Sequence, residues 1–144
     1  MEKLGLRPGM RAILLEPPAE YAERLRGIAT IPKCVRGTLD WIQFFVRRSA
    51  RLRQRFPVLK RHLAENGMLW IAWPKLSSGV ESDLSERVVR ELGLANGLVD
   101  VKVVSVNGTW SALKFVRRRR DRGFAGWNPP IIDTRRGLGI IQAT

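Results

Sequence analysis

A short polar loop holds the residues best suited to bind a ligand. It follows the apolar run of residues 68–73 and contains one lysine, two serines and a glycine. An ammonium group and hydroxyls can bind an anion, and glycine lets the backbone approach it closely. A helix predicted to begin at Asp83 would add the positive end of its dipole. We predict a small anion or polar-ligand site with Trp110 near its rim, formed by Lys75, Ser77, Ser78 and Gly79. The alternative is a hydrogen-bonded loop in which these residues only serve the turn.

Residues for catalysis or metal binding are scarce. Cys34 is the single cysteine and His62 the single histidine, which excludes an internal disulfide, a cysteine-based metal cage and a histidine cluster. A Ser-His-Asp arrangement has no support, and no Gly-Lys pair follows Gly79 to complete a phosphate-binding loop. Glu16 is either a lone functional carboxylate or a turn residue facing solvent. We therefore predict no catalytic residue, no metal and no cofactor.

The charge of the chain is strongly unbalanced. Its 144 residues include 26 Lys and Arg against 13 Asp and Glu, a net charge of +13. One basic stretch spans residues 47–61 and a second spans residues 117–122. Together they suggest sequence-independent contact with nucleic-acid phosphates through Arg47, Arg48, Arg51, Arg55, Arg117, Arg118, Arg119 and Arg120. The alternative is a solvated basic surface that reflects only an Arg-rich composition.

Hydrophobic patterning predicts an α/β protein. Strands are expected at residues 12–15, 40–46, 68–73, 99–106 and 111–116, with a weak strand at 32–35. Helices are expected at residues 19–26, 49–65 and 83–93, with a kink or break at Pro57 and a glycine stop at residues 66–67. Asn107-Gly108 predicts a closing hairpin. Alternating strands and helices predict a three-layer sandwich around a mostly parallel sheet.

The length of the chain fits one domain. We expect the folded domain to span residues 1–117, followed by a basic tail containing Gly and Pro at residues 118–144 that is flexible in part. The sequence shows neither a signal-peptide core nor an apolar run long enough to span a membrane. A cytoplasmic protein without membrane contact is the expectation.

Four segments, at residues 4–10, 68–75, 97–103 and 109–114, resemble a family of small bacterial proteins of unknown function. Members of that family carry the signatures "LW…WPK", "DL…VR…GL" and "TWS.LK". The resemblance implies a Rossmann-like domain similar to a shortened, degenerate S-adenosylmethionine methyltransferase. It further implies the strand order 2-1-3-4-6-5, with the weak strand as the second and an antiparallel sixth strand beside the fourth.

The residues that would hold this cofactor are missing from the sequence. The turn after the first strand, residues 16–19, contains no glycine, and Pro17 and Pro18 lack an N–H. No acidic residue follows the weak strand. We therefore predict a non-catalytic, methyltransferase-like scaffold that has lost its cofactor site and binds a protein or small-molecule partner. The alternatives are a ligand-binding protein or cryptic enzyme that uses the Lys75 loop, and a nonspecific nucleic-acid binder.

Overall fold

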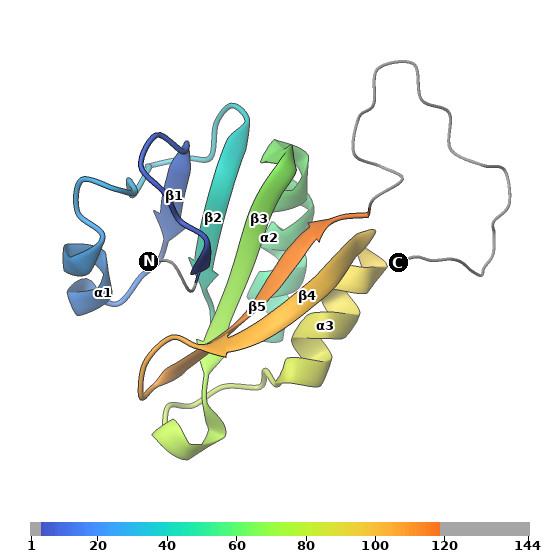
Figure 1. Ribbon diagram of the computed structural model, residues 1–144. Helices are drawn as coiled ribbons and strands as arrows, with labels where there is room; N and C mark the ends of the chain where they lie inside the picture. Colours follow the sequence, from blue (N-terminus) through green and yellow to red (C-terminus); the bar gives the residue numbers. More distant parts are fainter. Residues whose placement is uncertain (1–3, 119–144) are drawn as a thin grey trace, which may run out of the picture.

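The computed structural model describes residues 4–118, which form a five-stranded sheet with helices (Figure 1). The strands are β1 (Ala12–Leu15), β2 (Leu39–Phe45), β3 (Leu63–Pro74), β4 (Leu98–Ser105) and β5 (Trp110–Arg117). Their order is β1-β2-β3-β5-β4, with β1, β2 and β3 parallel and β5 antiparallel to both of its neighbours. The predicted α/β class and the insertion of the last strand beside β3 are confirmed.

The helices divide between the two faces of the sheet. α2 (Ser49–His62) and α3 (Glu86–Ala95) lie behind the sheet in Figure 1 and bury Leu52, Phe56 and Val89 against it. The short α1 (Ala19–Arg24) and the segment around Leu4 cover the other face near β1 and β2. The indole N–H groups of Trp41 and Trp70 both donate to the carbonyl oxygen of Leu4 at 2.9 Å. These bonds fix the N-terminal segment across β2 and β3.

The predicted weak strand at residues 32–35 does not form. The outer edge of β1 carries only an isolated parallel bridge between Ile13 and Thr30. Two backbone hydrogen bonds hold this bridge, from Leu14 N to Thr30 O at 2.8 Å and from Thr30 N to Ala12 O at 3.0 Å. Residues 33 and 34 then form a bend. Pro32 lacks the N–H that would continue the ladder.

The predicted glycine stop of the long helix was also wrong. α2 is a single helix that contains Pro57 and ends at His62, so Asn66 and Gly67 lie inside β3. A residue distant in the sequence donates hydrogen bonds to the carbonyl groups at the end of α2. Arg117 donates to Lys60 O at 2.6 Å and to Leu63 O at 2.7 and 3.1 Å. A long-range arginine therefore takes the place of a local helix stop.

α3 begins later than the sequence predicts. Its N-cap is Ser85, whose hydroxyl accepts from Val88 N at 3.3 Å, and not Asp83. The helix continues through Gly93, the predicted end, to Ala95. Gly93 is required for packing, because a Cβ atom there would overlap the ring of Phe115 on β5.

The closing hairpin forms as predicted between β4 and β5. The side-chain oxygen of Asn107 accepts from the backbone N–H groups of Thr109 and Trp110, both at 2.9 Å. This turn brings Trp110 opposite Pro74, the last residue of β3. The hairpin thereby joins the carboxyl end of β3, where the Lys75 loop begins.

Candidate functional site

The carboxyl ends of β1, β2 and β3 meet at one edge of the sheet, because these strands are parallel. Ligands of open α/β sheets bind at such an edge. Glu16 follows β1, Arg47 and Arg48 follow β2, and Lys75 follows β3. This edge is therefore the candidate site, and the contacts of its side chains decide what it can bind.

The turn after β1 is closed by an ion pair. Glu16 has a backbone φ of 54°, the left-handed region that favours glycine. Its carboxylate accepts from the guanidinium of Arg51 on α2, with Nε at 3.0 and 3.2 Å from the two oxygens and Nη2 in closer contact. Hydrogen bonding to Glu16 raises the pKa of Arg51. Glu16 is thus a paired turn carboxylate rather than a lone group.

The N-terminus of α2 is occupied by a side chain from a distant loop. The carboxylate of Asp83 accepts from Ser49 N at 2.8 Å and from the Ser49 hydroxyl at 2.9 Å. Both bonds lower the pKa of Asp83, and the bond from the Ser49 backbone N–H has the larger effect. Ser82 and Asp83 also donate to Arg47 O, at 2.7 and 3.2 Å. The position where a helix N-terminus would hold a bound anion is therefore filled by the chain itself.

The predicted Lys75 loop lies at this edge and is largely bonded to the protein. Lys75 N donates to Thr109 O at 2.7 Å, and Lys75 Nζ donates to the Ser105 hydroxyl at 2.5 Å. Ser78 donates to Lys75 O at 2.7 Å and accepts from Val80 N at 3.1 Å. The loop includes a 3₁₀ turn, η2 (Leu76–Ser78), which ends at left-handed Gly79. Ser77 in this turn is exposed.

Trp110 lies at the same edge as Lys75, so the structure brings these two predicted residues together. Its ring packs edge-to-face on Phe45, with centroids 5.1 Å apart, and Phe45 packs in the same way on Tyr21 at 5.0 Å. These contacts place Trp110 partly in the core. No observation in residues 4–118 assigns a ligand to the Lys75–Trp110 pair.

A buried polar pair was missed by the sequence analysis. Gln43 on β2 is fully buried, and the hydroxyl of Tyr21 on α1 lies near it. Burial raises the pKa of Tyr21 to about 12, while Gln43 acts to lower it. Within the described part of the chain, neither the hydroxyl nor the amide makes a hydrogen bond of ordinary geometry. The only sequence signal was a glutamine inside the apolar run of residues 41–46.

The predicted nucleic-acid residues do not all lie free on one surface. Arg48 pairs with Glu81 at 3.0 Å and Arg51 with Glu16. Arg117 is held by the end of α2, as described above. Arg47 is exposed, and Arg55 and Arg118 are half-buried. Arg119 and Arg120 lie outside the described residues, as does nearly all of the predicted tail.

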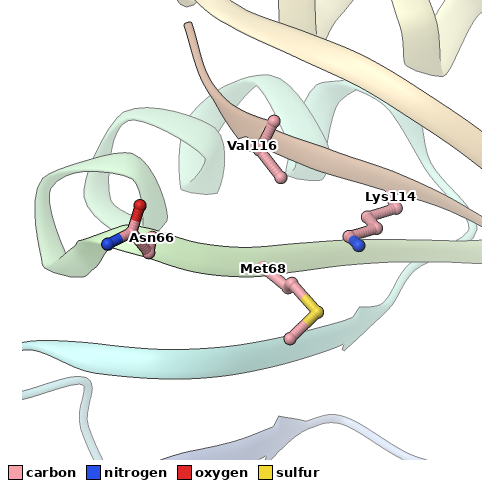
Figure 2. A pocket seen from close by; sticks show the side chains of 4 residues that line it. All are labelled: Asn66, Met68, Lys114 and Val116. Atoms are coloured by element: carbon pink, nitrogen blue, oxygen red, sulfur yellow. The ribbon is translucent and has the colours of Figure 1, made fainter. Parts of the chain in front are cut away.

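A hollow of about 230 Å³ lies elsewhere on the sheet. Asn66 and Met68 of β3 and Lys114 and Val116 of β5 line it (Figure 2). In the β3–β5 register these positions lie toward the start of β3, away from Pro74 and the Lys75 loop. The hollow therefore does not belong to the carboxyl-edge site.

Within residues 4–118, no cluster of three or more His, Cys, Asp or Glu side chains is arranged to hold a metal ion. The same residues include no helix with the length and apolarity needed to cross a bilayer.

Solved structures of several methyltransferases are similar to this chain. A SAM-dependent methyltransferase from Aquifex aeolicus matches with a TM-score of 0.56 and 15% identity, over 79% of this chain and 85% of that chain. The ribosomal protein L11 methylase of Lactobacillus delbrueckii subsp. bulgaricus matches at 0.55 and 16%, over 81% and 73%. The magnesium protoporphyrin IX methyltransferase of Synechocystis PCC 6803, with bound SAH, matches at 0.53 and 13%, over 76% and 74%.

These similarities show that the chain has a methyltransferase-like Rossmann fold. At such identities they establish the fold alone. No family model matches the chain, and no sequence relative is found among curated proteins.

Proposed function

We propose that this protein is a non-catalytic, methyltransferase-like scaffold that has lost its cofactor site and binds a partner. The observation that carries the proposal is the turn after β1. There Glu16 stands in the left-handed conformation and pairs with Arg51, and two prolines follow. A cofactor at this position would need backbone N–H groups and close approach, which glycines supply and prolines remove.

The remaining edge is equally unsuited to S-adenosylmethionine. The second strand, after which an acidic residue would hold the ribose hydroxyls, is reduced to the bridge at Thr30. Residues 31–36 contain no Asp or Glu. The residues present therefore do not fit the cofactor, and no methyl-transfer step is derived for this chain.

Apart from this second strand, the sheet is retained. The sheet keeps its parallel half, its antiparallel last strand and its two buried cores. A preserved scaffold with a closed cofactor turn favours a binding role over a catalytic one. The resemblance of residues 4–10, 68–75, 97–103 and 109–114 to small bacterial proteins with a degenerate domain supports the same proposal.

Calorimetric titration with S-adenosylmethionine tests the loss of the cofactor site. We expect no saturable binding, and a methyltransferase of the same fold serves as the positive control. A dissociation constant at or below about 10 μM, equivalent to about −7 kcal/mol, would overturn the proposal.

A second candidate function rests on the shared position of Lys75 and Trp110 at the carboxyl edge. A small anion or polar ligand there would be bound by Lys75 and the exposed Ser77, with Trp110 at the rim. This candidate is separable from the first, because it requires ligand-dependent stabilisation that the Lys75 side chain controls.

A further inference from the structure

Within residues 4–118, no helix covers half of one sheet face. α2 and α3 lie behind β4 and β5, and no helix lies in front of these two strands (Figure 1). Leu113 and Phe115 point toward α2 and α3, so the alternating residues of β5 point to the front. We call this surface the open half-face. It consists of Val99, Lys102, Val104, Lys114 and Val116.

The open half-face combines three valines with two lysines and is only partly shielded. Lys102 is exposed, and the other four residues are half-buried. The N-terminal segment around Leu4 covers the front of the sheet only as far as Met68, whose side chain lies against Gly5. The hollow of about 230 Å³ begins there and continues to Lys114 and Val116 (Figure 2). A cavity of about 150 Å³ holds a benzene ring, so this hollow has room for an aromatic side chain.

The chain leaves the sheet beside this hollow. β5 ends at Arg117, one residue after Val116. Of the 26 residues that follow Arg118, residues 123–132 carry no charge, in a protein of net charge +13. They include Phe124, Trp127, Ile131 and Ile132. An extended chain covers up to about 3.3 Å per residue, so this segment can fold back across β5 and β4.

The charges favour docking of this segment over the arginines that precede it. Lys102 and Lys114 lie opposite each other on β4 and β5. The positive charge of exposed Lys102 would repel Arg119, Arg120 and Arg122. Asp133 comes directly after the uncharged stretch and brings a carboxylate of the complementary sign.

We propose that residues 123–132 of this chain dock on the open half-face, with the Trp127 ring in the hollow and Asp133 beside Lys102. The segment supplies the apolar cover that residues 4–118 do not give β4 and β5. Burying an aromatic side chain there removes apolar area from water both on the ring and on the half-buried Val99 and Val116.

Methyl NMR of the methionines in the full chain tests the proposal, with Trp127→Ser as the variant. We expect Trp127→Ser to shift the Met68 methyl resonance, and to leave Met10, which packs near β1, unchanged. Ile141→Ser is the matched control, because it makes the same kind of change outside residues 123–132. It should leave the Met68 resonance in place, and the shift caused by Trp127→Ser should not depend on protein concentration.

Two results would overturn the proposal. A Met68 resonance unchanged by Trp127→Ser would mean that the half-face is open in the isolated chain, as a surface for another protein would be. A shift that grows with protein concentration would mean that a second copy covers it. Far-UV circular dichroism on both variants confirms that the fold is retained.

Discussion

Asp83 binds the backbone and the hydroxyl of Ser49, 34 residues earlier in the chain. The loop before α3 thereby caps α2. Because the pKa of Asp83 is lowered in the folded protein, its contribution to stability is present above the unfolded pKa of about 4. This stabilisation is lost as the pH falls through the lower pKa that Asp83 has in the folded protein.

Asp83→Ala should therefore lower the melting temperature at neutral pH. The difference from the wild type should shrink as the pH falls from about 4, where Asp83 of the unfolded chain becomes protonated, through the lower pKa that it has in the folded protein. Thermal unfolding, monitored by circular dichroism at several pH values between about 2 and 7, measures this difference in melting temperature. Glu81→Ala is the control, since among residues 4–118 the exposed Glu81 pairs only with the side chain of Arg48. Equal effects of the two substitutions at neutral pH would contradict the capping role.

Arg117→Ala should destabilise the protein by about 1–3 kcal/mol, because Lys60 O and Leu63 O lose a charged donor. Arg53→Ala removes the same charge from an exposed position on α2 and should change stability by less than about 0.5 kcal/mol. Urea unfolding of both variants gives the comparison. If Arg117→Ala proved as mild as Arg53→Ala, Arg117 would be available for phosphate binding instead.

Gly93→Ala should be destabilising although alanine is the better helix former. The helix gains about 1 kcal/mol from alanine, but the new Cβ would overlap several ring carbons of Phe115, which puts the cost at the upper end of overpacking, about 3 kcal/mol. Gly108→Ala, where no atom lies within 4 Å of the added Cβ, is the control. A stabilised Gly93→Ala variant in urea unfolding would show that β5 and α3 pack less closely than described.

Lys75→Ala should leave the free energy of unfolding within about 0.5 kcal/mol of the wild type, since the contact with Ser105 is exposed. If the anion-site candidate is correct, the variant should also lose any rise in melting temperature produced by inorganic phosphate. Lys33→Ala, at an exposed position outside the edge, should keep that rise. A fall of several degrees in the melting temperature of Lys75→Ala without phosphate would instead make Lys75 a structural residue.

Nucleic-acid binding, if present, should be an interaction with phosphates. Affinity for DNA should fall steeply between about 50 and 200 mM salt and should not depend on base sequence. Replacing Arg119 and Arg120 by Gln should reduce the slope of log affinity against log salt by about 0.9 for each lost phosphate contact. An unchanged slope, or a preference for one DNA sequence, would count against the basic stretches as a phosphate-binding surface.

The sequence predicts the parts of this fold that depend on local patterns. The apolar run at residues 68–73 locates the buried part of β3, although the strand begins earlier, at Leu63, and the Asn107-Gly108 turn places the hairpin correctly. The errors fall where distant residues decide the outcome. Asp83 looked like the cap of the next helix, but it binds Ser49 on the previous one. Asn66-Gly67 looked like a helix stop, but Arg117, 57 residues beyond Lys60, completes the end of α2.

In the candidate site, too, local features were predicted from the sequence and contacts between distant residues were not. The absence of glycine after β1 is visible in the sequence, whereas the pairing of Glu16 with Arg51 depends on how α2 lies against the turn. The position of Trp110 beside Lys75 follows from the hairpin and was predicted. The buried pair of Gln43 and Tyr21 comes from two separate elements, and the apolar run around Gln43 signals only one of its two members.

The irregular register of β4 bears on how the protein behaves when concentrated. β4 is an edge strand of the sheet, and Val101 and Val103 are exposed on it. A regular, flat edge of this kind invites pairing with the same strand of another molecule. The register shift between Asp100 and Lys102 interrupts the ladder, and Lys102 adds a charge at the same place. The register shift and the charge of Lys102 both oppose pairing of β4 with a strand of another molecule. An edge strand with exposed valines can therefore remain in solution without aggregating through its edge.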